Sequence, residues 1–203
     1  MKKVLPILIV IIAISAFGIY FMTRDEEVKN VDSEFLTDGR LLELSETPSE
    51  LVGFISNVKD NPSQVVRTNS ILWKMIYGGD FTQAERENLI SMQRMLFTQE
   101  LLDQNPKEFH FLTVEGEIEK WNEYEYKIIG SDYLPPTYLD VDTIDAKYEA
   151  KDLAVIKVVF YTNEIETEER ETDLFKEYIL IKTQMDKWEI IGWVDTDKFD
   201  IVK

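Results

Sequence analysis

The sequence predicts an α+β protein: an N-terminal transmembrane helix, then a domain whose helices pack on one face of an antiparallel sheet. Three observations carry this prediction. Residues 4–22 carry no charge, four helix-start signals lie between residues 61 and 106, and three strand-like segments follow residue 150. Helices that precede a run of antiparallel strands favour a domain with all its helices gathered on one side of the sheet.

Residues 1–22 are interpreted as a membrane anchor. As a helix, the uncharged run 4–22 would span about 28 Å, close to the roughly 30 Å hydrocarbon core of a bilayer. Lys2 and Lys3 precede the run, so the positive-inside rule keeps the N-terminus cytoplasmic and the rest of the chain outside the cell. A signal peptide cleaved at Ala16-Phe17-Gly18 is the alternative, although the chain stays apolar to residue 22.

Composition bounds the rest of the chain. The whole chain of 203 residues has a net charge of −17, and a surface this acidic repels nucleic-acid phosphates, so we expect no nucleic-acid partner. A hydrophobic content of 44% argues against disorder, and the chain length outside the anchor suits one domain and a tether. The sequence has no cysteine, which excludes disulfides, thiolate chemistry and a lipid-modified cysteine.

Residues 23–60 are interpreted as a tether with short helical segments, ahead of an extracytoplasmic α+β domain at 61–203. The tether is polar and acidic, with few apolar residues before Leu51. A short helix is expected around Leu36–Leu44, and apolar residues recur at helical spacing in Leu51–Val58.

The first two strong helix starts are local capping patterns. Asn61-Pro62 places a capping side chain before a first-turn proline, and the predicted helix runs to Tyr77, where Gly78-Gly79 ends it. Thr82 and Glu85 have the spacing of a capping box, in which each side chain satisfies a backbone N–H of the other.

Two further helix starts follow. Thr98 is placed to cap a short turn through Leu101-Leu102. Asn105-Pro106 repeats the first start signal and opens a helix on which apolar residues recur at helical spacing from Phe111 to Trp121.

Strand-like segments fill the C-terminal half of the chain. Tyr126–Ile129 is short and β-prone, and Pro135-Pro136 breaks the chain after it. Ala154–Tyr161 is almost wholly apolar, which is typical of a strand buried on both faces. Leu174–Lys182 and Trp188–Val194 are predicted as two further strands, joined by a turn around residues 184–187.

The stretch from Asn61 to Val194 resembles an uncharacterised family of single-pass clostridial membrane proteins. The matching motifs are Pro62-Ser63-Gln64-Val65-Val66, Phe81-Thr82 with Glu85, Leu101-Leu102 before Asn105-Pro106, Lys176-Glu177-Tyr178-Ile179-Leu180, and Trp188-Glu189-Ile190-Ile191-Gly192-Trp193. That family is similar in outline to the nuclear-transport-factor-2-like superfamily. The resemblance implies a cone-shaped α+β domain with a curved antiparallel sheet, and it supplies no catalytic residues.

Polar residues that suggest chemistry each have a plainer interpretation. His110 is the only histidine, which excludes a multi-histidine metal site and favours a packing or surface role. Two aspartate clusters fall short of the calcium-loop pattern, since its required glycine and glutamate are missing. Solvated acidic loops are expected, with weak calcium binding by the clustered carboxylates as the alternative. The clusters are Asp140, Asp142 and Asp145, and Asp195, Asp197 and Asp200. A third group, Glu164, Glu166, Glu168, Glu169 and Glu171, is interpreted as a solvated hairpin tip, with a basic partner as the alternative.

Aromatic residues leave two interpretations open. They would fill the core, where aromatic side chains bury large areas, or line a pocket between helices and sheet. The residues concerned are Trp73, Trp121, Trp188, Trp193, Tyr126, Tyr161 and Tyr178.

The sequence lacks the common signatures of nucleotide-binding proteins, serine hydrolases and zinc enzymes. We therefore expect no enzyme, and no catalytic, cofactor-binding or metal-ligating residues. The leading hypothesis is a membrane-anchored extracytoplasmic module, held in the cell membrane through residues 4–22, that binds an envelope protein or a wall component. The alternatives are a conjugation or type IV secretion scaffold component, which shares this architecture, and a protein with a pocket for a small apolar ligand.

Overall fold

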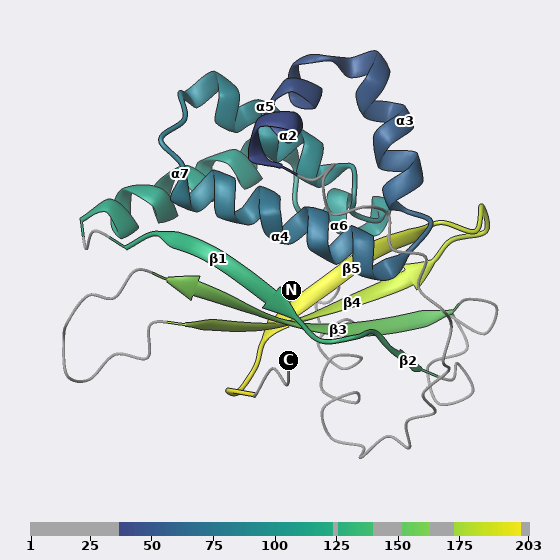
Figure 1. Cartoon of the computed structure of the whole chain (residues 1–203). Coiled ribbons are helices and arrows are strands. Elements are labelled where there is room, and N and C mark those ends of the chain that lie inside the picture. The colour runs from purple at the N-terminus through teal and green to yellow at the C-terminus, as the bar shows by residue number, and fades with distance from the viewer. Residues whose placement is uncertain (1–36, 124–125, 140–151, 163–172, 200–203) are drawn as a thin grey trace.

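The computed structural model describes residues 37–123, 126–139, 152–162 and 173–199, and these form an α+β body (Figure 1). Its helices all lie on one face of a five-stranded antiparallel sheet, which confirms the predicted fold class at this level. The helices are α2 (Asp38–Glu46), α3 (Pro48–Val58), α4 (Pro62–Gly78), α5 (Gln83–Arg94), α6 (Gln99–Gln104) and α7 (Lys107–Asn122).

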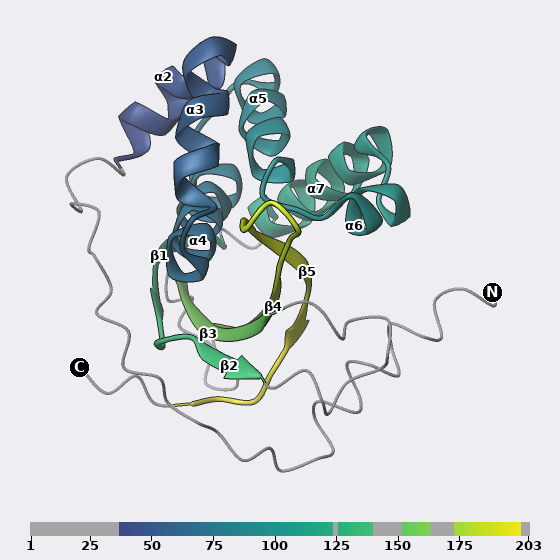
Figure 2. The same ribbon diagram turned by 90° about the vertical axis from the view of Figure 1, so that its right-hand side faces the viewer.

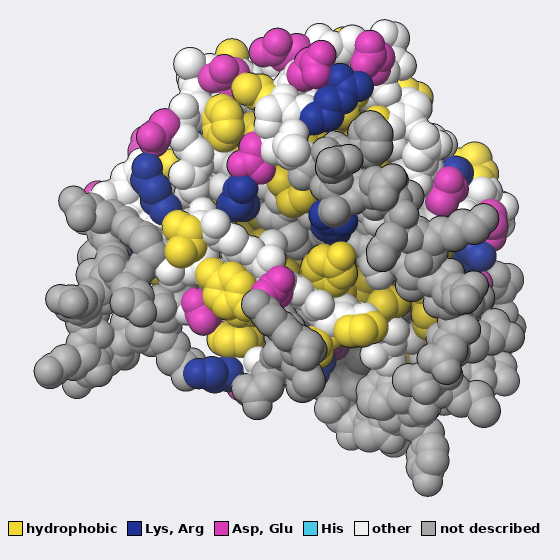
Figure 3. Space-filling model, in the orientation of Figure 1, with side chains coloured by type: hydrophobic (Ala, Val, Ile, Leu, Met, Phe, Trp, Pro, Cys, Tyr) yellow, Lys and Arg dark blue, Asp and Glu magenta, His cyan; other side chains and the backbone are white. Residues whose placement is uncertain are grey.

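The sheet has the strand order β1-β3-β4-β5, and β2 also pairs with β3. The strands are β1 (Ile128–Tyr133), β2 (Thr137–Leu139), β3 (Leu153–Thr162), β4 (Leu174–Lys182) and β5 (Trp188–Asp195). Figure 2 shows the sheet bent into a trough, with α4 lying across its open side. Seen from the side of Figure 3, hydrophobic side chains gather along the junction between helices and sheet, and acidic ones lie along the top of the helical layer.

Local capping explains most of the helix starts. The Asn61 side chain accepts a hydrogen bond from the Ser63 N–H at 2.8 Å, and Thr82 and Glu85 form the predicted reciprocal box. The Thr98 hydroxyl accepts from the Leu101 N–H. The prediction that Asn105 caps α7 is wrong, because Pro106 occupies the cap position without a side-chain hydrogen bond.

Strands β3, β4 and β5 follow the predicted segments to within one residue at each end. The segment predicted at Tyr126–Ile129 overlaps β1 only at its last two residues, and the strand continues to Tyr133. Strand β3 is buried on both faces, as the apolar run predicted, and β4 has the predicted bounds. Strand β2 was not predicted. It continues the edge begun by β1 after an interruption at Pro135-Pro136, and the two strands pair with opposite halves of β3. Proline has no N–H for the ladder, so it is tolerated at such an edge.

The described part of the predicted tether is not separate from the body. Helices α2 and α3 are the expected short helical segments, but they pack onto the helical layer. Leu41 and Leu44 are fully buried in the main core, together with Ile55 and Val58 of α3. The folded body therefore includes α2 and α3, because a few well-placed leucines are enough to dock an otherwise polar helix.

A main core lies between the helices and the concave face of the sheet, and side chains alternate between the two faces along each strand. On β3, for example, Ile156 and Phe160 join the main core, whereas Val155 faces the opposite side. A smaller apolar cluster occupies that convex face; its buried members are Leu139, Leu153, Val155, Ile179 and Ile181.

Within the described residues, no helix is long and apolar enough to cross a membrane. The predicted anchor, residues 1–22, lies outside the described part of the chain.

Candidate functional site

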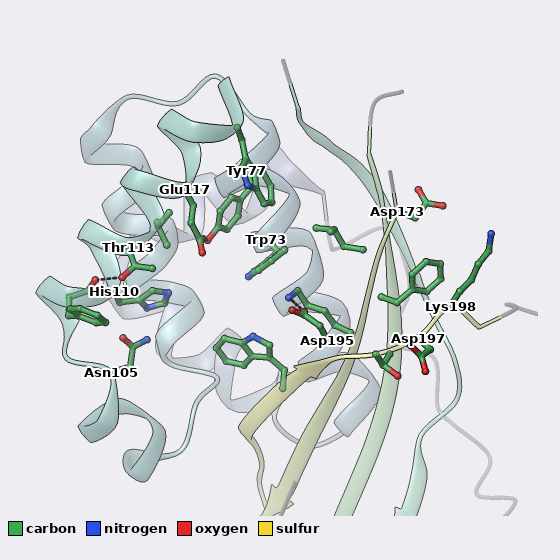
Figure 4. Close-up of a pocket in the computed structure, with 18 residues that line it drawn as sticks. Trp73, Tyr77, Asn105, His110, Thr113, Glu117, Asp173, Asp195, Asp197 and Lys198 are labelled. Carbon is green, nitrogen blue, oxygen red and sulfur yellow. Dashed lines mark hydrogen bonds and ion pairs between the residues drawn. The ribbon is translucent and has the colours of Figure 1, made fainter. Parts of the chain in front are cut away.

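A half-open cleft of about 730 Å³ lies between α7, α4 and the ends of β4 and β5 (Figure 4). Trp73 and Tyr77 of α4 form its floor, α7 forms one wall, and residues 193–198 form the other. Its volume falls in the range of about 300–1,000 Å³ that is typical of small-molecule sites.

Stacked aromatic rings shape the floor. The ring of Trp73 lies 4.7 Å from that of Tyr77 and 4.9 Å from that of Phe160, measured between centroids. Trp121 of α7 packs 4.8 Å from Tyr77 and edge-on to Trp73 at 6.5 Å. Such tilted and edge contacts suit the ring quadrupoles, so these rings stabilise one another's positions at the floor of the cleft.

Tyr77 and Glu117 form a hydrogen-bonded pair between α4 and α7. The Tyr77 hydroxyl donates to Glu117 Oε2, and Figure 4 shows the two side chains beside each other. Burial, with the negative charge of Glu117 beside it, raises the pKa of Tyr77 far above its ordinary value. Tyr77 therefore stays a neutral donor at every physiological pH.

Lys176 brings a buried cation to the middle of the cleft. Its Nζ lies 2.6 Å from Asp195 Oδ1 and 4.8 Å from the centroid of Trp73. The lysine side chain is only 10% exposed, whereas that of Asp195 is 84% exposed. The ammonium group of Lys176 therefore already occupies this face of Trp73 and pairs with Asp195.

His110 is held as a neutral imidazole. Arg94 donates to the Asn105 carbonyl at 2.7 Å, and the same guanidinium nitrogen lies 3.3 Å from His110 Nδ1. A guanidinium only donates, so Nδ1 must accept and the ring proton is assigned to Nε2. Burial, with the charge of Arg94 as a second cause, lowers the pKa of His110 to about 4. The Phe97 ring stacks on the imidazole at 6.3 Å.

The cleft carries more negative than positive charge. Its charged lining residues are Glu117, Asp173, Asp195, Asp197, Lys176 and Lys198. Four carboxylates and two ammonium groups thus line the cleft, and His110 adds no charge at neutral pH. Aromatic faces beside an excess of carboxylates suit a ligand with a cationic group on an apolar stem.

The structure divides the aromatic residues that the sequence singled out. Trp73, Trp121 and Trp193 line the cleft, as one of the two interpretations expected. Trp188 packs against Tyr138 at the opposite end of β5. Of the three tyrosines, Tyr126 lies behind Trp121, Tyr178 is buried beside Trp193, and Tyr161 donates to Asp132 away from the cleft.

The acidic clusters of the sequence do not meet in the described structure. Asp195 and Asp197 both line the cleft, whereas Asp200 lies outside the described residues. Residues 140–151 and 163–172, which hold the other two clusters, also lie outside them. Within the described ranges, no three carboxylate or histidine side chains are grouped to hold a metal ion.

Sequence reasoning missed Tyr77, Glu117 and Lys176. Lys176 carried a readable signal, since it shares strand parity with the buried residues Tyr178 and Leu180 and so faces the core. Glu117 lies three residues after Val114, the one fully buried residue of α7, which places it on the inward side of that helix.

Comparison with known proteins gives one match. A family model described as Domain of unknown function (DUF6715) matches residues 1–193. This agrees with the expectation of an uncharacterised family. No curated protein and no solved structure matches the chain.

Proposed function

We propose that the chain, which belongs to the family of that domain of unknown function, is a membrane-tethered, non-enzymatic module that binds another protein of the cell envelope. The observation that carries this proposal is the half-open cleft between α7 and β5, with its aromatic floor and negative charge. We place the partner's contact there and on the adjoining surface of α7.

The ionisable groups of the cleft favour binding over proton transfer. A general acid or base works best with a pKa near the working pH. His110 has its pKa lowered to about 4, and that of Tyr77 is raised beyond the physiological range. Lys176 is held by Asp195. Neither His110 nor Tyr77 is therefore poised to exchange a proton at neutral pH, and both side chains supply hydrogen bonds.

An exposed apolar strip beside the cleft favours a protein partner. Phe109 and Leu112 of α7 are 63% and 69% exposed and lie three residues apart, on neighbouring positions of the helix surface. Phe109 also lines the cleft. Large apolar side chains that gather beside a concave site are typical of interaction surfaces.

The proposal includes a place in the cell. Residues 4–22 anchor the protein, the N-terminus is cytoplasmic, and the body is extracellular, as the charge pattern around the apolar run predicts. We also propose a nuclear-transport-factor-2-like cone for the body. The trough-shaped sheet with α4 across its open side supports this assignment (Figure 2).

Site-specific photo-crosslinking in cells tests the proposal. A photoreactive amino acid at position 109 or 112 should capture a reproducible envelope protein. The same amino acid at Val52, which is 61% exposed on α3, is the matched control and should capture none. Equal capture from all three positions, or from no position, would count against a partner at α7.

A small amphipathic ligand is the second candidate, and the cleft volume favours it. An apolar fluorescent probe would then bind the full-length protein with micromolar affinity, and Trp193→Ala would weaken binding. Unchanged binding in Trp193→Ala would place the probe elsewhere.

A further inference from the structure

Strand β5 is an edge of the sheet, and its first half is already covered. Ile190 donates from its N–H to the Leu96 carbonyl at 2.9 Å, and its own carbonyl accepts from the Thr98 N–H at 3.0 Å. These two bonds make a short parallel bridge between Phe97 and Ile190. The chain then turns into α6, so the bridge does not continue along β5.

The second half of β5 presents its backbone outward. The Thr196 N–H donates to the Phe175 carbonyl, and hydrogen-bonded pairs alternate along an antiparallel ladder. Val194 therefore bonds to β4, whereas the N–H and C=O groups of Trp193 and Asp195 point away from the sheet. Within the described residues, no hydrogen bond from another element reaches these groups.

A bulge explains why the open part begins where it does. The pairing between β4 and β5 shifts between Ile179 and Leu180, so Ile191 is an extra residue on β5. Without a bulge, every second residue of β5 would point its N–H and C=O groups away from β4. The extra residue lengthens this interval by one, so the outward groups of Ile190 are followed by those of Trp193. Burial also falls along the strand, from buried Ile190 to exposed Asp195.

This open edge forms one wall of the cleft, and α7 forms the other. Trp193 and Asp195 line the cleft from β5, and Phe109, His110 and Glu117 line it from α7. An extended chain lying in the cleft would reach both walls. Its backbone would meet the edge of β5, and alternate side chains would point toward the aromatic floor.

We infer that the edge of β5 at Trp193–Asp195 takes up an extended, basic segment of the partner protein by strand addition. The inference rests on the proposed function and names the chemistry of the partner. The excess of carboxylates around the edge selects Lys or Arg on the added strand, and ring faces accept the apolar stem of such a side chain.

Two substitutions at one position isolate the backbone contribution. Asp195→Ala removes the carboxylate and keeps the outward N–H. Asp195→Pro removes both, and proline is tolerated where an edge N–H faces outward. The probe is a random 12-residue display library, selected against the full-length protein in nanodiscs. We expect selected peptides to be rich in Lys or Arg, and to bind Asp195→Pro at least tenfold more weakly than Asp195→Ala.

Amide hydrogen exchange of the unaltered protein gives an independent measurement, which holds even if Asp195→Pro fails to fold. The amides of Trp193 and Asp195 should exchange at least tenfold more slowly once a selected peptide is bound. The Val194 amide should be protected with or without the peptide, because it bonds to β4.

Three results would overturn the addition of a basic partner segment to this edge and leave the proposed function standing. Selected peptides that bind without protecting the Trp193 and Asp195 amides would be one. Crosslinking of an envelope protein at Phe109, without enrichment of any peptide, would be another. A dimer that Asp195→Pro dissociates would show that a second copy occupies the edge. If neither peptide nor crosslinked partner is found, both proposals fail.

Discussion

Truncating Leu44 to alanine tests whether α2 is part of the folded body. Leu44 is 1% exposed and packs in the main core with Leu41, which is fully buried. Cutting a fully buried leucine back to alanine removes its transfer free energy and leaves a cavity, at a cost of about 2–5 kcal/mol. A leucine on a free tether would cost almost nothing.

Urea unfolding followed by tryptophan fluorescence measures this cost. All four tryptophans lie at or after Trp73, so their signal reports on the body and not on α2 itself. With a slope of about 2 kcal/mol/M, a loss of 3 kcal/mol lowers the urea midpoint by about 1.5 M. Val52→Ala, at an exposed helical site, is the control and should change stability by about 0.5 kcal/mol or less. If Leu44→Ala shifts the midpoint no further than Val52→Ala does, α2 is a separate segment and the reasoning is refuted.

Three further predictions concern the rest of the body. A Cβ at Gly78 would clash with the backbone oxygen of Ile128, so Gly78→Ala should lower the thermal midpoint. Gly116 lies on α7 with open space around it, so Gly116→Ala should raise stability by about 0.5–1 kcal/mol. Calorimetry of the two variants compares these effects. Because folding lowers the pKa of His110, the contribution of its neutral ring to stability is fully present above pH 6.5 and is lost as the pH falls toward 4. His110→Gln should therefore flatten the plot of unfolding free energy against pH between pH 4 and 6.5. Equal slopes for the variant and the unaltered protein would contradict the assignment. Lys176→Met should lower the free energy of unfolding in urea by less than about 1 kcal/mol, because it leaves only the exposed Asp195 carboxylate unpaired. A loss above about 3 kcal/mol would mean that the charge pair itself stabilises the fold.

Local chemistry made much of the fold predictable. Caps such as Asn61 and the Thr82–Glu85 box depend on residues within one turn, so sequence alone reveals them. Strand β3 was predictable because burial on both faces demands an unbroken apolar run. Strand β2 was not, since three residues carry no periodicity. The docking of α2 was missed because it depends on two leucines in a polar segment, whose partners lie far along the chain.

The aromatic part of the cleft was predictable and its polar part was not. Large rings are rare on a surface, so a core or pocket role for Trp73 and Trp121 follows from residue type. The polar pairs join residues 40 positions apart for Tyr77 with Glu117 and 19 apart for Lys176 with Asp195. Such pairs depend on how helices and strands are placed against one another, which no local pattern encodes.

The way in which α7 is held explains why a cleft remains beside it. At one end, Trp121 packs on Trp73 and Tyr77; at the other, Arg94 holds the Asn105 carbonyl ahead of the helix. These contacts come from other helices of the helical layer, so the position of α7 does not depend on close packing against β5. Among the described lining residues, no buried polar side-chain atom lacks a hydrogen-bond partner, so the polar pairs of the cleft are already formed in this structure. A binding partner would therefore meet a preformed surface and lose little free energy to ordering it. Affinity would then come from the ring faces and the backbone edge of β5, with the polar pairs left intact.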